Sequence, residues 1–151
     1  MIIRNVKPED ATSLQAIRHL DEPLIAHRLA TQASGATEFL VVEAAGQLVS
    51  FVVLKYYGKE TYPYIPDIED LYTKVEERGK GYATALLAAC ESRAKARGFT
   101  QISLAAGVDP TDPARRLYEK LGYRYDGKVS YVDGVYNGVQ DWVIDMIKDL
   151  A

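Results

Sequence analysis

The spacing of hydrophobic and polar residues changes several times between a strand-like and a helix-like period along the first half of the chain. This half predicts a strand, two helices and a hairpin. They are a strand at Ile2–Val6, a helix from Pro8 to about Leu20, a helix beginning at Asp21-Glu22-Pro23, and strands at Phe39–Ala44 and Gln47–Tyr56 around Ala45-Gly46. A loop rich in Tyr and Pro follows at Gly58–Pro66.

The second half predicts a strand–helix–strand unit, a further helix and a final hairpin. The segments are Ile68–Val75, Gly81–Arg97, Gln101–Ala105, Pro113–Leu121, Arg124–Val132 and Val139–Ile147. Short loops around the long helix favour parallel pairing of the strands that flank it. Gly122 stands at the C-terminal cap position of the next helix. Asp133-Gly134 and Asn137-Gly138 supply turn residues for the hairpin.

The junction between strand 68–75 and helix 81–97 has the composition of an anion site. It contains Arg78, Gly79, Lys80 and Gly81. Glycines let the backbone turn tightly and bring N–H groups close to a ligand, and a helix N-terminus adds partial positive charge. The two cationic side chains add full charges. The junction therefore predicts a phosphate or pyrophosphate site, the alternative being a solvated turn.

Two common nucleotide loops do not fit this spacing. A Walker A loop needs an early glycine and a Ser or Thr after its Gly-Lys pair, but Lys74 and Gly81 occupy those positions. A dinucleotide fingerprint fits Gly79 and Gly81 but meets Thr84 at its third glycine. No clear second strand–helix–strand half follows, so a dinucleotide fold is not predicted.

Two segments together resemble the GNAT N-acetyltransferase superfamily. Arg78-Gly79-Lys80-Gly81-Tyr82-Ala83 is similar to its Arg/Gln-x-x-Gly-x-Gly/Ala signature, and Ala114–Tyr123 is similar to its downstream A-x-x-L-Y-E-K-x-G-F/Y motif. The resemblance covers the whole chain and implies a single domain, 1–151. The implied fold is α/β, a mixed twisted sheet in the order β-α-α-β-β-β-α-β-α-β-β with helices on both faces. The implied activity is N-acetyl transfer, with acetyl-CoA as co-substrate.

The resemblance also implies where coenzyme A binds. The pyrophosphate would lie on a run of seven residues: Arg78, Gly79, Lys80, Gly81, Tyr82, Ala83 and Thr84. In the family the fourth and fifth strands splay apart, which leaves the backbone of Leu71, Tyr72 and Thr73 free for the pantetheine arm and the thioester. The alternative is that these three are ordinary strand residues with no role in binding. The family often places Asn where this chain has Thr111, so Thr111 or Asp112 would replace it, and Asp112 also suits a helix cap.

Tyr118, in the second motif, is the candidate general acid. Acetyl transfer requires a polarised carbonyl, a deprotonated amine and a protonated leaving group. A phenol with a pKa near ~10 can protonate a thiolate whose thiol has a pKa near ~8.5. In the family this tyrosine points at the sulfur of coenzyme A. The alternative is that Tyr118 only packs its helix against the sheet.

An amine acceptor also needs a base, because its pKa near ~10.4 keeps it protonated at neutral pH. Glu69 and Asp70 head the fourth strand, and strand alternation would send them to opposite faces. Glu43 is a further candidate, and solvated surface charge is the alternative for all three. The run Glu69-Asp70-Leu71-Tyr72 resembles the polyamine and diamine branch of the family, a feature that members with other acceptors share.

Several tyrosines surround the loop before the fourth strand: Tyr56, Tyr57, Tyr62 and Tyr64. Aromatic faces hold cations, so they favour an acceptor pocket over the alternative of a covered sheet edge. Tyr131 and Tyr136, near the final hairpin, would join this pocket or form a dimer surface, and dimers are frequent in the family.

Composition narrows the class of protein. One cysteine in 151 residues excludes an intrachain disulfide, and a reducing cytoplasm is the expected location. The net charge of −3 argues against a nucleic-acid partner, and no apolar run reaches the ~20 residues of a membrane span. His19 and His27 lack partners at ligand spacing, so no metal is expected. The sequence predicts a small-molecule amine acceptor. The alternatives are a protein amine acceptor or a coenzyme A-binding module without catalysis.

Overall fold

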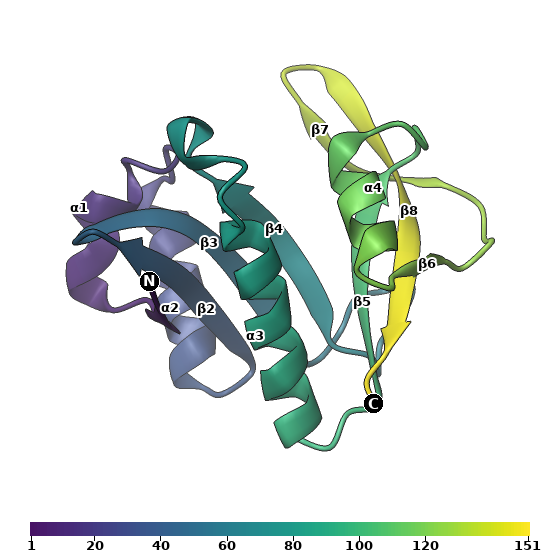
Figure 1. Cartoon of the computed structure of the whole chain (residues 1–151), viewed down its shortest axis with the longest axis horizontal. Helices are drawn as coiled ribbons and strands as arrows, with labels where there is room; N and C mark the ends of the chain where they lie inside the picture. Colours follow the sequence, from purple (N-terminus) through teal and green to yellow (C-terminus); the bar gives the residue numbers. More distant parts are fainter.

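The computed structural model describes residues 1–151 and places eight strands in one sheet (Figure 1). The strands are β1 (Ile2–Asn5), β2 (Thr37–Ala44), β3 (Gln47–Lys55), β4 (Asp67–Thr73), β5 (Gln101–Gly107), β6 (Arg124–Tyr125), β7 (Tyr131–Tyr136) and β8 (Val139–Asp149). The helices are α1 (Ala11–Leu14), α2 (Glu22–Ala33), α3 (Tyr82–Ala96) and α4 (Pro113–Lys120), with short 3-10 turns at Pro8–Asp10 and Val75–Glu77. The sheet order is β1-β2-β3-β4-β5-β8-β6, and β7 also pairs with β8.

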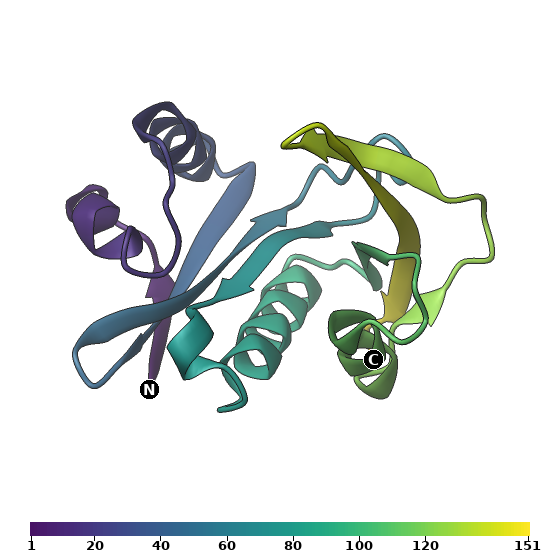
Figure 2. The same ribbon diagram turned by 90° about the horizontal axis from the view of Figure 1, so that it is seen from above.

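Helices cover both faces of this sheet, as the resemblance implied. α1 and α2 lie on one face, and α3 and α4 lie on the other (Figure 2). Each face has its own apolar core. Phe39 and Phe51 belong to the core beneath α1 and α2, whereas Leu86 and Leu87 belong to the core beneath α3. Burial of these side chains is the main driving force that holds the helices on the sheet.

Local capping fixes where two of the helices begin. The side chain of Asp21 accepts a hydrogen bond of 2.9 Å from the N–H of Leu24 at the start of α2. Asp112 does the same for the N–H of Ala114 at the start of α4, also at 2.9 Å. A proline occupies the first turn in both cases, where its missing N–H removes no helical bond. The predicted cap at Asp112 is therefore confirmed.

β4 and β5 form the only parallel pair, and they stay together for a short distance. Their register contains two pairs, Asp67 with Ser103 and Ile68 with Leu104. Beyond these residues the strands diverge, with α3 beside β4 and α4 beside β5 (Figure 1). The divergence leaves the last part of β4 without a partner on its β5 side, as the resemblance implied. The opening between the strands positions the site described below.

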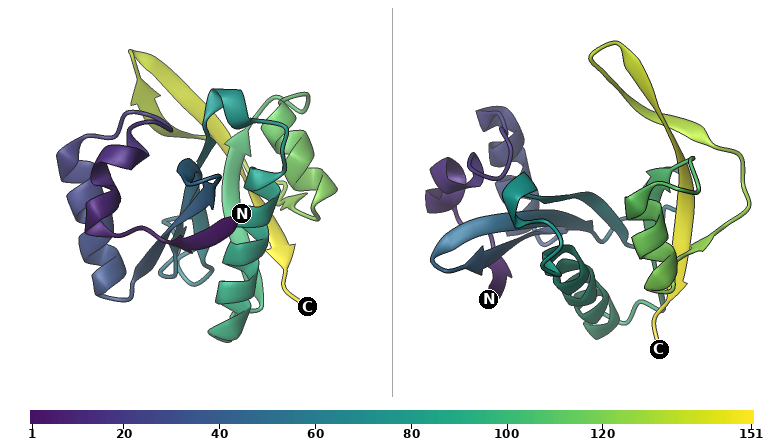
Figure 3. Two further views of the ribbon diagram at one scale, coloured as in Figure 1. Left: turned by 60° about the vertical axis from the view of Figure 1, so that its left-hand side comes forward. Right: turned by 45° about the horizontal axis from the view of Figure 1, so that its top comes forward.

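Two elements differ from the sequence prediction. The helix predicted from Pro8 to Leu20 ends at Leu14, because the side chain of Gln15 bonds both backbone groups of Leu20, at 2.7 and 2.9 Å, and holds a turn there. The strand predicted at 124–132 is two short strands, β6 and β7. Asp133-Gly134 lies within β7, so the turn of the β7–β8 hairpin is made by Asn137-Gly138, both with positive φ. This hairpin projects past the rest of the sheet (Figure 3).

A bulge in β4 overturns the prediction that Glu69 and Asp70 face opposite sides. The register with β3 shifts between Phe51 and Val53, and Asp70 has the left-handed φ of 53°. Glu69 pairs with Val53, whose side chain belongs to the core under α1 and α2. Asp70 bonds arginines on the same face, as described below. A bulge inserts one extra residue and cancels one alternation, so both carboxylates lie on the α1/α2 face.

Candidate active site

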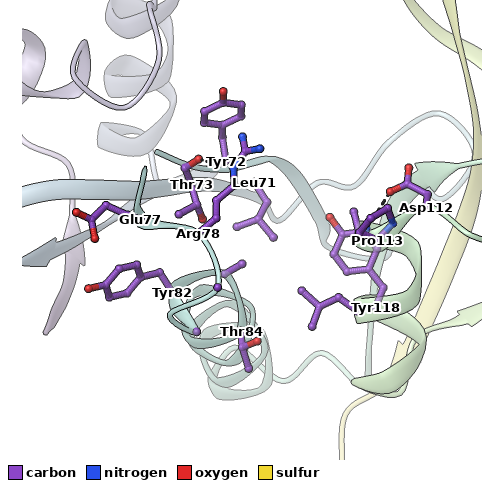
Figure 4. Close-up of a pocket in the computed structure, with 15 residues that line it drawn as sticks. Leu71, Tyr72, Thr73, Glu77, Arg78, Tyr82, Thr84, Asp112, Pro113 and Tyr118 are labelled. Atoms are coloured by element: carbon purple, nitrogen blue, oxygen red, sulfur yellow. Dashed lines mark hydrogen bonds between the residues drawn. The ribbon is translucent and has the colours of Figure 1, made fainter. Parts of the chain in front are cut away.

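A cleft of about 660 Å³ opens where β4 and β5 diverge. Its walls are the end of β4, the loop before α3 and the first turns of α4 (Figure 4). It is lined by Leu71, Tyr72, Thr73, Glu77, Arg78, Gly79, Gly81, Tyr82, Ala83, Thr84, Asp112, Pro113, Ala114, Leu117 and Tyr118. The volume falls within the range of small-molecule sites. Most of the predicted site residues therefore meet at one cleft, although they come from separate parts of the sequence.

The loop before α3 has the geometry of an anion site. Gly79 and Gly81 have φ values of 79° and 86°, a left-handed conformation that other residues rarely adopt. Gly81 is the N-cap of α3 and offers no capping side chain. The first N–H groups of α3 are therefore available to an anion, and the positive end of the helix lies at the cleft.

Arg78 and Lys80 take different positions at this loop. The Nε of Arg78 donates a hydrogen bond of 3.1 Å to the carbonyl of Thr73, and its guanidinium lies 5.0 Å from the centre of the Tyr72 ring. Arg78 thus connects the loop to the end of β4. The Nζ of Lys80 lies 2.7 Å from Glu77 in an exposed ion pair, and Lys80 is not part of the cleft wall.

The end of β4 presents its residues to two sides. The side chain of Leu71 points into the cleft, whereas the ring of Tyr72 points away from it (Figure 4). That ring stacks on Phe51, with the ring centres 6.1 Å apart, on the α1/α2 face. The hydroxyl of Thr73 lies 2.8 Å from that of Ser50. The backbone of these β4 residues lies between the cleft on one face and α1 and α2 on the other.

Tyr118 is on α4, and its side chain lies on the wall of the cleft opposite the anion loop (Figure 4). Its hydroxyl has no hydrogen-bond partner within the protein, and its ring packs edge-on against Tyr123, 6.2 Å between centres. Burial, and then the charge of Asp112, raise the pKa of Tyr118. The phenol therefore stays protonated at neutral pH and remains a proton donor to anything bound in the cleft.

Thr111 is the one predicted cofactor residue besides Lys80 that does not line the cleft. It is exposed, and its hydroxyl lies 2.8 Å from Asp109. The next residues, Asp112 and Pro113, line the cleft instead. A contact from Thr111 to the pantetheine arm stays a prediction. The wall formed by Pro113, Ala114 and Leu117 was not predicted, although the positions of Ala114 and Leu117 within about one turn of Tyr118 were a usable signal.

The three candidate bases have different surroundings. Glu69 is half-exposed and lies 3.2 Å from the Nζ of Lys55. Burial raises the pKa of Asp70, but hydrogen bonds from Arg18 and Arg28 outweigh it and lower the pKa. A carboxylate held in this way is a weak base. Glu43 lines a separate hollow with Arg4. None of the three lines the cleft, and a role for any of them as the base stays a prediction.

The tyrosines near the loop before β4 do not form one aromatic pocket, so that prediction is wrong. Tyr56 is buried in the core beneath α3 and its hydroxyl bonds Glu38. Tyr62 bonds Asp126 at 2.5 Å, and Tyr57 and Tyr64 are exposed. Successive side chains at the end of β3 point to opposite faces of the sheet, so Tyr56 lies on the face opposite to Lys55.

The same structure contains no group of three or more His, Cys, Asp or Glu side chains placed to hold a metal ion. None of its helices combines the length and the apolar character that a membrane crossing needs.

Comparison with known proteins agrees with this geometry. Residues 6–123 match the acetyltransferase (GNAT) family, so the chain belongs to that family and the resemblance read from the two motifs is confirmed. An acetyltransferase of Sodalis glossinidius (strain morsitans) is 34% identical over 91 residues. That alignment spans 60% of this chain and 60% of the length of the relative.

Solved structures share the fold at low sequence identity. A ribosomal-protein-alanine N-acetyltransferase from Brucella melitensis has a TM-score of 0.82 at 19% identity, over 99% of this chain and 100% of the other. A phosphinothricin acetyltransferase from Sinorhizobium meliloti, in complex with acetyl-CoA, has 0.78 at 20%, over 99% and 88%. A spermidine/spermine N-acetyltransferase from Vibrio cholerae has 0.76 at 19%, over 99% and 92%. These likenesses confirm the predicted fold.

Proposed function

We propose that this chain is an acetyl-CoA-dependent N-acetyltransferase that acetylates a primary amine of a small molecule. The observation that carries the proposal is the cleft itself. An uncapped helix N-terminus with two left-handed glycines lies at one end, and the free hydroxyl of Tyr118 lies on the opposite wall. The first feature suits a pyrophosphate, and the second suits a leaving thiolate. Acetyl-CoA carries both groups, and a fold neighbour binds it.

Several groups in and beside the cleft have a role in this proposal. The N–H groups at the start of α3 bind the pyrophosphate, and Arg78 holds the loop against β4. The backbone of Leu71, Tyr72 and Thr73 orients the pantetheine arm and polarises the thioester carbonyl. The amine attacks the carbonyl carbon directly from the α1/α2 face. The new C–N bond forms as the C–S bond breaks, and Tyr118 gives its proton to the departing sulfur. Before the attack, the ammonium passes one proton to Glu69, directly or through water. After the C–N bond has formed, the nitrogen loses a second proton, which restores the phenol of Tyr118 directly or through water.

The acceptor class is the finer part of the proposal. The fold neighbours act on acceptors as different as a ribosomal protein and spermidine, so the fold does not select between them. The run Glu69-Asp70-Leu71-Tyr72 resembled the polyamine branch, but Asp70 is committed to two arginines and offers no free carboxylate to a polycation. The second candidate, a coenzyme A-binding module, would share the anion loop and would have no use for the hydroxyl of Tyr118.

A thiol-release assay tests the proposal. The protein is incubated with acetyl-CoA and a panel of amino acids, amino sugars, polyamines and peptides, and acetylated products are identified by mass spectrometry. We expect turnover with a small-molecule amine. Turnover with peptides alone would support a protein acetyltransferase. Coenzyme A binding without turnover of any amine would support the binding module and contradict the proposal.

A further inference from the structure

Two arginines on the acceptor face converge on a single carboxylate. Arg18, in the turn after α1, binds Asp70 with both terminal nitrogens, each at 2.7 Å. Arg28, on α2, binds the same carboxylate through Nη2 at 2.8 Å. Asp70 is ionised because its pKa is lowered. Two positive charges therefore share one negative charge, and the group of three carries a surplus of one positive charge.

Aromatic rings hold both guanidinium groups in place. The Cζ of Arg18 lies 5.2 Å from the centre of the Phe51 ring and 5.0 Å from that of Tyr72. The Cζ of Arg28 lies 5.2 Å from the centre of the Phe39 ring. Fixed guanidinium groups lose little conformational freedom when they bind a ligand, which favours binding.

The arginines also have donor capacity that the protein does not use. Arg28 is nine-tenths buried, yet its Nη1 has no hydrogen-bond partner. Leaving a buried donor unpaired is unfavourable, so further negative charge near this guanidinium is favoured. The side chain of Arg18 is 34% exposed, so its remaining N–H groups are accessible from solvent. The pair thus combines a surplus charge, an unpaired donor and an accessible side.

The location of the pair relates it to the acceptor. Arg18 contacts the ring of Tyr72, which points away from the cleft. Tyr72 is one residue from Leu71, whose side chain points into the cleft. A second charged region lies on the same side, on the β7–β8 hairpin. There Asp133 and Asp141 have no ion-pair partner, and partial burial and then the charges of Asp141 and Glu69 raise the pKa of Asp133. Positive and negative charge therefore occupy different parts of the acceptor side.

We propose that Arg18 and Arg28 bind a carboxylate of the acceptor, so that the preferred substrate is an amino-acid-type zwitterion and not a polycation. The carboxylate accepts hydrogen bonds from the accessible N–H groups of Arg18, and the buried guanidinium of Arg28 adds a second positive charge behind them. The ammonium end of the same molecule lies toward β4 and Glu69, within reach of the thioester. This inference rests on the proposed function, because it names the substrate class of the same site.

Matched acceptors test the inference on the unmodified protein. Each L-amino acid is compared with its amide, which keeps the amine and the side chain but lacks the carboxylate, and spermidine is included. We expect kcat/KM for the best amino acid to exceed that for its amide by about tenfold or more. An amide lowers the pKa of the adjacent ammonium, which by itself favours the amide. A preference for the acid therefore cannot arise from amine basicity.

A variant then assigns the preference to the arginines. In Arg18→Gln, Asp70 keeps its bond from Arg28, and we expect KM for the amino acid to rise about tenfold while KM for the amide and for acetyl-CoA is unchanged. Arg124→Gln is the matched control, since Arg124 is exposed on β6 and pairs only with Asp149. It should change none of these values.

The outcomes separate this inference from the proposed function. Equal rates for acids and amides, faster acetylation of amides or spermidine, or an unchanged preference in Arg18→Gln would each overturn the carboxylate site and leave the acetyltransferase proposal standing. Failure to acetylate any amine would overturn the proposed function, and the carboxylate site with it.

Discussion

Replacing Tyr118 by Phe separates chemistry from packing in this cleft. The hydroxyl of Tyr118 bonds nothing in the protein, and its ring packs edge-on against Tyr123. Phe keeps the ring and removes no internal hydrogen bond, so the free energy of unfolding should change by no more than about 0.5 kcal/mol. Loss of a general acid should lower kcat by roughly a hundredfold to ten-thousandfold. That loss corresponds to about 3–5 kcal/mol in the activation free energy.

Tyr123→Phe is the matched control, since it removes the same atom from a neighbouring ring. Tyr123 is 2% exposed, and its hydroxyl donates a hydrogen bond of 2.7 Å to Glu91. Glu91 keeps its ion pair with Lys148 at 2.8 Å. The variant should therefore lose about 1–2 kcal/mol of unfolding free energy. Because Tyr123 does not line the cleft, kcat should fall by less than about tenfold.

Three measurements on the two variants distinguish a catalytic role of the Tyr118 hydroxyl from a packing role. Urea unfolding gives stability, calorimetry gives the affinity for coenzyme A, and thiol release at saturating substrates gives kcat. We expect Tyr118→Phe to be stable, to bind coenzyme A normally and to turn over slowly. Unchanged turnover in Tyr118→Phe would refute the role of the phenol and leave the proton of the leaving group to water. A large loss of stability would refute the account of its packing.

The remaining predictions concern the anion loop, the bulge and the cysteine. Arg78→Ala removes the bond to Thr73 and a positive charge at the loop, so the Kd for coenzyme A should rise about tenfold by calorimetry, and an unaltered Kd would contradict this assignment. Asp70→Asn should lower the free energy of unfolding by about 3 kcal/mol at neutral pH, because it leaves two arginines without their anion. Because the pKa of Asp70 is lowered in the fold, its contribution is present above ~4 and is lost as pH falls through the lowered pKa, so the two proteins should converge in acid. A difference in unfolding free energy between the unmodified protein and Asp70→Asn that did not depend on pH would contradict this explanation. Burial raises the pKa of Cys90 to about 12, so thiol reagents should modify it only after unfolding, and rapid modification of the native protein would show that α3 opens.

Much of the cleft could be predicted because its parts are local in sequence. The glycines at Gly79 and Gly81, the helix that follows them and Tyr118 all lie in short segments whose spacing carries the chemistry. Helix starts at Asp21 and Asp112 were similarly local, since a cap acts on N–H groups two or three residues away.

Two predicted site residues contact near neighbours in the chain instead of the cleft. Lys80 has a predicted role in the anion loop, yet an ion pair with Glu77 holds it outside the cleft wall. Thr111 likewise turns to Asp109. Side chains of this length choose among several neighbours at similar energies, and sequence spacing does not decide which neighbour is within reach.

The sequence by itself determined the element order up to the fourth helix, the anion loop and the tyrosine of the second motif, because periodicity and short motifs act within one or two turns. The tertiary structure decided which side of the sheet each charge occupies. One extra residue in β4 placed Asp70 beside Glu69, and the fold then brought Arg18 and Arg28 to it from 52 and 42 residues away. Register shifts and long-range ion pairs leave no local pattern, since they follow from how the whole sheet and its helices pack.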